Sequence, residues 1–194
     1  MSAVRERRER ERAARHQLIV AAARELAEAE GWEAVTTRRL AERVEYSQPV
    51  LYSHFSGKDA IVRAVAIDGF GRLGAHLHHA RTATPWRREA LRAACRAYLE
   101  FASKRPALYQ AMFVMPTDLK FAHAETPPEL RAAFDEFVSC FRPDNARREL
   151  FAEVIWSALH GIAVLSESGR IPPDSEEERL DFLITQLADT PSSG

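Results

Sequence analysis

Apolar residues recur at intervals of three and four along most of the chain, and no stretch alternates strictly between apolar and polar positions. The first spacing is typical of amphipathic helices, whereas strict alternation marks half-buried strands. Leu18, Ala22 and Leu26, for example, line one face of a first helix that Gly31 is expected to end. The pattern therefore predicts an all-α protein with about nine helices.

Short helices are expected near the N-terminus. Thr36 or Thr37 can cap a second helix that continues to Val44. A break at residues 45–47 precedes a third short helix, and a fourth begins near Lys58. Two short helices separated by three residues have the dimensions of a helix-turn-helix, whose second helix enters the major groove of DNA.

Longer helices are expected after His79, separated by breaks at residues 82–85, 105–106, 126–128, 142–144 and 171–173. The segment 150–165 is apolar over most of its circumference, which is typical of a helix that is buried on two sides. A final amphipathic helix runs through residues 180–187.

The chain is accordingly divided into four parts. Residues 1–15 are expected to form a flexible charged arm, and residues 16–60 a three-helix DNA-binding domain. Residues 61–189 are expected to form an effector-binding and dimerisation domain, and residues 190–194 a disordered tail.

The net charge of −1 hides an uneven distribution. Residues 1–58 carry 11 basic and 9 acidic side chains, a balance of +2, and the remainder carries 16 basic and 19 acidic, a balance of −3. No run approaches the ~18 apolar residues that a membrane-spanning helix needs. The Arg/Glu-rich N-terminus is not a secretory signal, and Cys95 and Cys140 lack a CxxC spacing. We therefore expect a cytoplasmic protein with no membrane partner.

The predicted helix-turn-helix separates apolar from polar positions. Six apolar positions are expected to face inward: Leu40, Ala41, Val44, Val50, Leu51 and Phe55. Eight others are expected to face solvent, where they can contact phosphates or base edges of DNA: Thr37, Arg38, Ser47, Gln48, Pro49, Tyr52, Ser53 and His54. Gln48 is the best candidate for reading a base, because glutamine pairs bidentately with adenine. Pro49 and Val50 offer apolar surface to a thymine methyl, and Lys58 suits a phosphate.

The residues themselves sharpen this prediction. The segments Thr36–Ala41, Ser47–Phe55 and Lys58–Ile61 read TTRRLA, SQPVLYSHF and KDAI. They resemble the DNA-binding domain of TetR family transcriptional regulators. The resemblance implies backbone contacts from Thr36 and Arg38, base contacts from Gln48, Pro49 and Val50, and phosphate contacts from Tyr52, His54 and Lys58.

The turn departs from the family pattern at Glu45, where a glycine is usual. A residue other than glycine is strained at positive φ, and a carboxylate near DNA repels phosphate. Either the turn has another geometry, or Glu45 points away from the DNA.

The second half carries a looser resemblance. Trp156–Gly161 reads WSALHG and follows Arg105–Tyr109, RPALY, and the pair Met112-Phe113. These residues are similar to a TetR C-terminal domain type named for a Trp-His-Gly motif. The resemblance implies an effector domain that forms a homodimer through its last two long helices.

Aromatic and apolar residues of this half are candidates for contacts with a small apolar or aromatic effector. They are Phe101, Tyr109, Met112, Phe113, Phe137, Trp156 and His160. A ligand pocket has this composition, but so does a packed core, which is the competing interpretation. His160 lies in an apolar segment and needs a polar partner in the protein, water or ligand.

Two other motifs are set aside. Residues 69–74 match GxGxxG, but a helical segment precedes them where a dinucleotide site needs a strand, so no cofactor is expected. These glycines are expected to loosen the end of the fourth helix. His76, His78 and His79 have no cysteine or carboxylate at ligand spacing, so no metal is expected.

These observations predict a homodimeric repressor that binds a palindromic operator in double-stranded DNA and is released by a small molecule. An activator, or a ligand-binding protein with altered DNA binding, is the alternative. An enzyme is disfavoured because no Ser or Cys pairs with a His at motif spacing.

Overall fold

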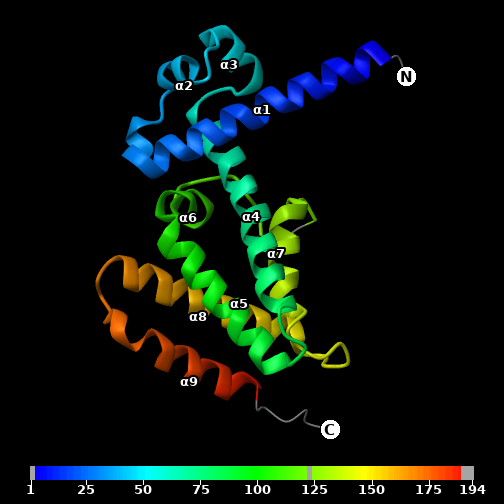
Figure 1. The fold of residues 1–194 in the computed structure, drawn as a ribbon, viewed down its shortest axis with the longest axis vertical. Coiled ribbons are helices and arrows are strands. Elements are labelled where there is room, and N and C mark those ends of the chain that lie inside the picture. The colour runs from blue at the N-terminus through cyan, green and yellow to red at the C-terminus, as the bar shows by residue number, and fades with distance from the viewer. Residues whose placement is uncertain (1–2, 122–123, 189–194) are drawn as a thin grey trace. The chain divides into compact units, whose positions relative to one another are not determined.

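The structure is a computed structural model that describes residues 3–121 and 124–188. Within these ranges nine α-helices and two short 3₁₀ helices follow one another, with no strand (Figure 1). In order they are α1 (Ala3–Glu30), η1 (Trp32–Ala34), α2 (Thr37–Arg43), α3 (Gln48–His54), α4 (Lys58–Thr82), α5 (Arg87–Lys104), α6 (Pro106–Phe113), α7 (Pro128–Val138), α8 (Arg148–Glu167), η2 (Pro173–Ser175) and α9 (Glu176–Ala188). The predicted all-α class is confirmed. The tail predicted over residues 190–194 lies outside the described residues.

The chain packs as two compact units. Unit 1 consists of Met1–Gly69 and Arg105–Lys120, and unit 2 of Phe70–Lys104 and Phe121–Gly194. Helix α4 begins in unit 1 and ends in unit 2, and α6 belongs to unit 1. The predicted boundary at residues 60/61 concerns the division of function and stays a prediction.

Unit 1 is organised around α1, whose second half supplies buried Ile19, Ala23 and Leu26. Polar contacts join the start of α6 to the end of α1 and to η1. The Glu28 carboxylate accepts a 2.9 Å hydrogen bond from the Leu108 amide, and Trp32 Nε1 donates to the Ala107 carbonyl at 2.8 Å. Glu28 therefore caps the N-terminus of α6, where backbone amides lack partners within their own helix.

The first half of α1 differs from the expected flexible arm, because the chain is helical from Ala3 onward. Its side chains are exposed through residue 14, so no core supports it. Pairs of opposite charge four residues apart stabilise it instead, namely Arg5 with Glu9 at 2.9 Å and Arg7 with Glu11 at 3.5 Å. The alternation of Arg and Glu led to the prediction of a flexible arm, but the same alternation is also typical of a solvent-exposed helix.

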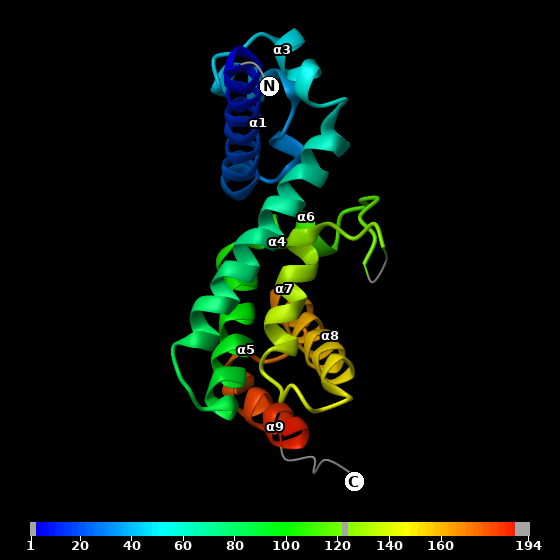
Figure 2. The ribbon, with the colours of Figure 1, turned by 90° about the vertical axis from the view of Figure 1, so that its right-hand side faces the viewer.

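Unit 2 is a bundle in which α5 contacts α7, α8 and α9 (Figure 2). Its core includes the fully buried side chains of Tyr98, Phe101, Phe137 and Ile155. Ion pairs join α5 to α9 at the surface, between the guanidinium groups of Arg92 and Arg96 and the carboxylates of Glu177 and Asp181. Buried apolar contacts thus hold the bundle, and charged pairs border it.

The glycines at 69–74 do not loosen a helix end, because α4 continues through them to Thr82. A Cβ at Gly69 would lie 2.6 Å from Met112 Sδ, and one at Gly74 would lie 3.4 Å from the Ala133 Cα. The first approach falls within unit 1 and the second within unit 2. The expected soft point is therefore wrong, and these glycines let neighbouring helices pack closely.

Helix α8 is more apolar than the sequence analysis allowed. Within the described ranges it is the one helix whose length and composition suffice to cross a membrane, with a mean hydropathy of 1.3. Core helices of other proteins pass the same test. Four large apolar side chains of α8 are nevertheless exposed, at Leu150, Val154, Val164 and Leu165.

Candidate nucleic-acid interface

The predicted helix-turn-helix is formed by α2 and α3. Thr36 caps α2, since its Oγ1 accepts a 3.2 Å hydrogen bond from the Arg39 amide. The chain then turns through residues 44–47, where the Tyr46 amide donates to the Ala41 carbonyl at 2.9 Å. Pro49 occupies the first turn of α3. Backbone N–H groups in the first turn have no partner within the helix, so the N–H that proline lacks costs no hydrogen bond there.

Five of the six positions expected to face inward are buried: Leu40, Ala41, Val44, Leu51 and Phe55. Val50 is only half-buried, so part of its side chain remains available for the base contact implied by the family resemblance. The small core fixes α3 against α2, and the opposite side of α3 is left to solvent.

The turn keeps the left-handed geometry that glycine usually provides. Glu45 has φ of 57°, the one positive φ outside glycine in the described chain, and its side chain is exposed. The alternative of a different turn geometry is therefore wrong. A residue other than glycine in this conformation costs about 1 kcal/mol or more.

Most of the predicted DNA contacts lie on the exposed side of the two helices. Gln48, Pro49 and Tyr52 are exposed, Tyr52 at 54% of its surface. Tyr52 Oη lies 3.5 Å from Thr37 Oγ1, which brings the hydroxyls of α3 and α2 together. The remaining predicted contacts on this side are Thr36, Arg38, Ser47 and Ser53, all of them exposed.

His54 ends α3 beside a second histidine that sequence reasoning did not select. Its ring centroid lies 6.4 Å from that of His16, which itself stacks 4.6 Å from Phe55. Partial burial, followed by the charge of Arg12, lowers the pKa of both His54 and His16 below the ordinary value. The environment therefore favours the neutral form of both rings. The phosphate contact of His54 stays a prediction.

Lys58 has a structural partner that the sequence did not suggest. Its Nζ donates to the Trp32 carbonyl at 2.6 Å in a half-buried setting. The two residues are 26 positions apart and share no motif, so no local signal pointed to this bond. The predicted phosphate contact of Lys58 stays a prediction, and this hydrogen bond is a second reason for a lysine there.

The candidate effector residues are divided between the two units. Tyr109, Met112 and Phe113 belong to α6 in unit 1. The other four belong to unit 2, where Phe101 and Phe137 are fully packed in the core. Burial favours core packing for Phe101 and Phe137, and the effector contacts stay a prediction.

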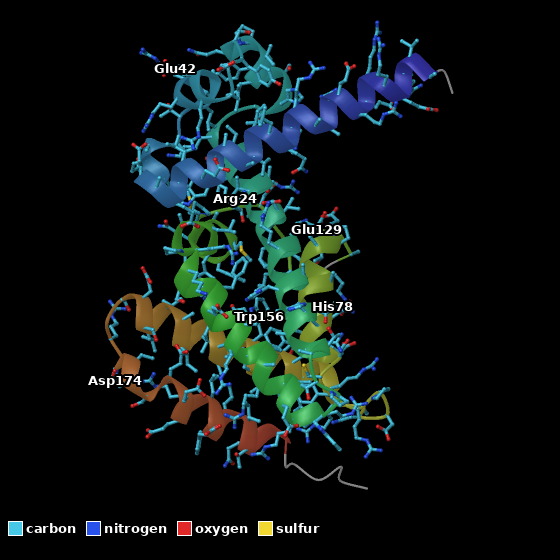
Figure 3. The ribbon with its side chains drawn as sticks, viewed as in Figure 1. Arg24, Glu42, His78, Glu129, Trp156 and Asp174 are labelled. Atoms are coloured by element: carbon cyan, nitrogen blue, oxygen red, sulfur yellow. The ribbon has the colours of Figure 1, made fainter. Side chains whose placement is uncertain are left out.

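Trp156 of α8, which is labelled in Figure 3, is the centre of an aromatic cluster in unit 2. Its Nε1 donates to Tyr98 Oη at 3.2 Å, and its ring lies 5.9 Å from Phe121 and 6.2 Å from Phe134. His160 follows one turn later on α8, and partial burial lowers its pKa. Phe121 and Phe134 were missed because they lie more than 20 residues from Trp156, in segments without a motif.

The two cysteines and the histidine cluster lie in settings that suit neither redox chemistry nor a metal. Cys95 and Cys140 are buried, and burial raises the pKa of both thiols, that of Cys140 to about 12. The thiols are therefore protonated packing groups. His78 Nδ1 lies 3.0 Å from Glu136, which also pairs with Arg81. Within residues 3–121 and 124–188, no three His, Cys, Asp or Glu side chains gather as a metal site.

Comparison with known proteins agrees with both halves of the fold. Residues 19–65 match the family profile described as bacterial regulatory proteins, tetR family. Residues 91–187 match the profile described as tetracyclin repressor-like, C-terminal domain. That description does not name a Trp-His-Gly type, so the subtype stays a prediction.

Individual relatives point the same way. The chain is 28% identical over 173 residues to an uncharacterized HTH-type transcriptional regulator, Rv0681, of Mycobacterium tuberculosis, covering 88% of this chain and 78% of that one. It is 30% identical over 101 residues to another, YobS of Bacillus subtilis, and the match spans only about half of each protein, 52%.

A crystal structure of a tetR family regulatory protein from Rhodococcus RHA1 has the same fold. It superposes with a TM-score of 0.58 at 19% identity, over 89% of this chain and 96% of that one. Profiles match both halves of the chain, and the C-terminal match alone spans half of its length. This protein belongs to the TetR family of transcriptional regulators.

Proposed function

We propose that this regulator is a cytoplasmic repressor that binds a two-fold symmetric operator as a homodimer and is released by a small apolar or aromatic ligand. The observation that carries the proposal is the geometry of α2 and α3. Their apolar sides are buried together, and Gln48, Pro49 and Tyr52 are left exposed along one side of α3. Such a helix fits the major groove, with base contacts from its N-terminal residues.

The dimer is supported by an uncovered apolar face on the last two long helices. Phe182 of α9 is 70% exposed, and it lines a hollow of about 380 Å³ with Ala158 and Ile162 of α8. Val154 and Leu165 continue the exposed apolar surface along α8. Monomers rarely expose such a surface, so a second copy of this chain is its expected cover.

The effector is supported by the aromatic cluster around Trp156. Aromatic side chains with a few polar groups, here Tyr98 Oη and His160, are what an apolar or aromatic ligand needs. Release from DNA then follows from thermodynamic linkage. If the ligand binds more tightly to the conformation with low operator affinity, then the bound ligand lowers operator affinity by the same factor by which operator DNA lowers ligand affinity. Members of the family are regulators, which are in general not enzymes, and no catalytic role is proposed.

Selection of bound fragments from the organism's own genomic DNA tests the proposal. We expect recovery of a sequence with two-fold symmetry, its half-sites separated by about one helical turn or a multiple of it. Recovery of no preferred sequence would contradict DNA regulation. An asymmetric sequence would contradict the dimer.

The strained turn gives a prediction for both stability and binding. Glu45→Gly removes the positive-φ strain of about 1 kcal/mol and raises the midpoint of thermal unfolding by about 2–4 °C. It leaves operator affinity within a few-fold of wild type, because on the remaining alternative the Glu45 carboxylate points away from the DNA. Thermal denaturation and operator titration measure the two quantities.

Glu45→Ala is the matched control, since it removes the charge and keeps the strain. We expect Glu45→Ala to leave both the operator affinity and the unfolding temperature unchanged. Equal unfolding temperatures for the glycine and alanine variants would show that the turn is not strained.

A further inference from the structure

The positive charge of the DNA-binding head, residues 1–58, is concentrated at its N-terminus. Residues 1–15 carry six arginines and three glutamates, a balance of +3. Residues 16–58, which include the whole helix-turn-helix, carry five basic and six acidic side chains, a balance of −1. A protein that neutralises phosphates needs basic groups on its DNA face, and residues 16–58 as a whole have no excess of them.

The basic groups of residues 16–58 are also already engaged. Four arginines pair with carboxylates at 2.7–3.2 Å: Arg24 with Asp68, Arg38 with Glu42, Arg39 with Glu30 and Arg43 with Glu25. Lys58 donates to the Trp32 carbonyl. Within residues 1–15, Arg5, Arg7 and Arg15 also pair with carboxylates, whereas Arg8, Arg10 and Arg12 have no carboxylate partner among the residues that the structure describes. Arg8, Arg10 and Arg12 can therefore bind an anion without first breaking an ion pair.

Helical periodicity directs some of these arginines to the side of the helix-turn-helix. Arg5, Arg8 and Arg12 follow one another at intervals of three and four, and the same stripe continues into Ile19 and Ala23. Those two residues are fully buried in unit 1, so the stripe faces the core there. Figure 1 shows α1 continuing past α3 toward its N-terminus, where arginines replace apolar residues on this stripe.

Contacts at the end of α3 hold this part of α1 in place. Arg12 Nη2 donates to the Ser53 carbonyl at 3.5 Å, and the His16 ring stacks on Phe55. From Arg12 back to Ala3 the helix extends nine residues, or about 13 Å. One strand of a duplex carries a phosphate about every 3.4 Å along its axis, so this length corresponds to as much as about four base pairs.

We infer that Arg8 and Arg12, the members of the arginine row Arg5, Arg8 and Arg12 that have no ion pair, bind phosphates of the DNA that flanks the half-site read by α3. This surface supplies the electrostatic attraction that residues 16–58 lack, and α3 supplies sequence reading. The inference rests on the proposed function, because α3 in the major groove is what brings α1 to the flanking DNA.

The test compares two double variants on two duplexes. Arg8→Gln/Arg12→Gln removes two charges from the row, and Arg7→Gln/Arg10→Gln removes two charges from other faces of the same helix. Each is titrated with the selected operator, once with about ten base pairs of flank on each side and once trimmed to the half-sites. The titrations are repeated at several salt concentrations, and circular dichroism checks that the variants fold.

On the flanked duplex, Arg8→Gln/Arg12→Gln is expected to bind about 10- to 100-fold more weakly than wild type. The slope of log K against log salt is expected to fall in magnitude by about 3 to 4, because each dimer then neutralises about four fewer phosphates. On the trimmed duplex this variant and wild type bind alike. The Arg7/Arg10 control stays within a few-fold of wild type on both.

Three results would overturn the inference while the proposed function stands: wild-type affinity of Arg8→Gln/Arg12→Gln on the flanked duplex, an equal loss in the control, or an equal loss on the trimmed duplex. Failure of the proposed function appears differently, as the absence of any selected operator for the wild-type protein. In that case, the DNA affinities of the two double variants are still compared by titrating each with a duplex of mixed sequence at low salt.

Discussion

Gln48→Ala is expected to lower operator affinity by about 30-fold to about 10⁴-fold. A bidentate contact with adenine is worth about 1–3 kcal/mol, and a dimer loses two of them, or about 2–6 kcal/mol. Gln48 is exposed at the start of α3 and is not part of the core, so the variant is expected to fold normally. Fluorescence anisotropy with the selected operator measures the loss, and base preference relaxes at one position in each half-site.

Gln110→Ala is the matched control, because Gln110 is an exposed glutamine of the same unit, on α6. It should leave operator affinity unchanged. If Gln48→Ala keeps both the affinity and the base preference of wild type, then α3 does not read the operator through this residue.

Phe182→Asp is expected to dissociate the dimer and, with it, most of the operator affinity. The substitution places a carboxylate in the apolar surface of α8 and α9, where burial of an unpaired charge is costly. Two linked DNA-binding heads bind an operator about 10²- to 10⁴-fold more tightly than one head does. The monomeric variant is therefore expected to lose operator affinity by about that factor. Sedimentation gives the oligomeric state, and titration of the same sample gives the affinity.

Trp86→Asp controls for the loss of a large exposed apolar side chain. Trp86 precedes α5 and, like Phe182, is 70% exposed. We expect Trp86→Asp to remain dimeric and to bind the operator normally. A dimeric Phe182→Asp protein with wild-type affinity would place the interface elsewhere.

The helix-turn-helix was predictable because the forces that form it are local. The Thr36 cap, the apolar spacing of Leu40, Val44 and Leu51, and the break before α3 all lie within about 20 residues. Each of these features stabilises its own segment whatever the rest of the chain does. The sequence therefore indicated both the element bounds and the exposed side of α3.

The features that were missed depend on contacts between distant segments. Glu28 caps α6 from 80 residues away, and this contact helps place α6, with its three effector candidates, in unit 1 rather than in unit 2. Trp156 was recognised, but its neighbours Phe121 and Phe134 were not, since apolar residues at helical spacing pack alike in any core. The extent of α1 was missed for another reason: its first half buries no apolar face, and charge pairs were the only signal.

Titration of the selected operator and of a shuffled duplex of equal length and composition, over a range of salt concentrations, tests the central claim most directly. We predict one dimer per operator, at least about 10³-fold preference over the shuffled duplex, and log K that falls linearly with log salt. Equal affinity for the two duplexes, or affinity independent of salt, would contradict the account of this protein as an operator-binding regulator.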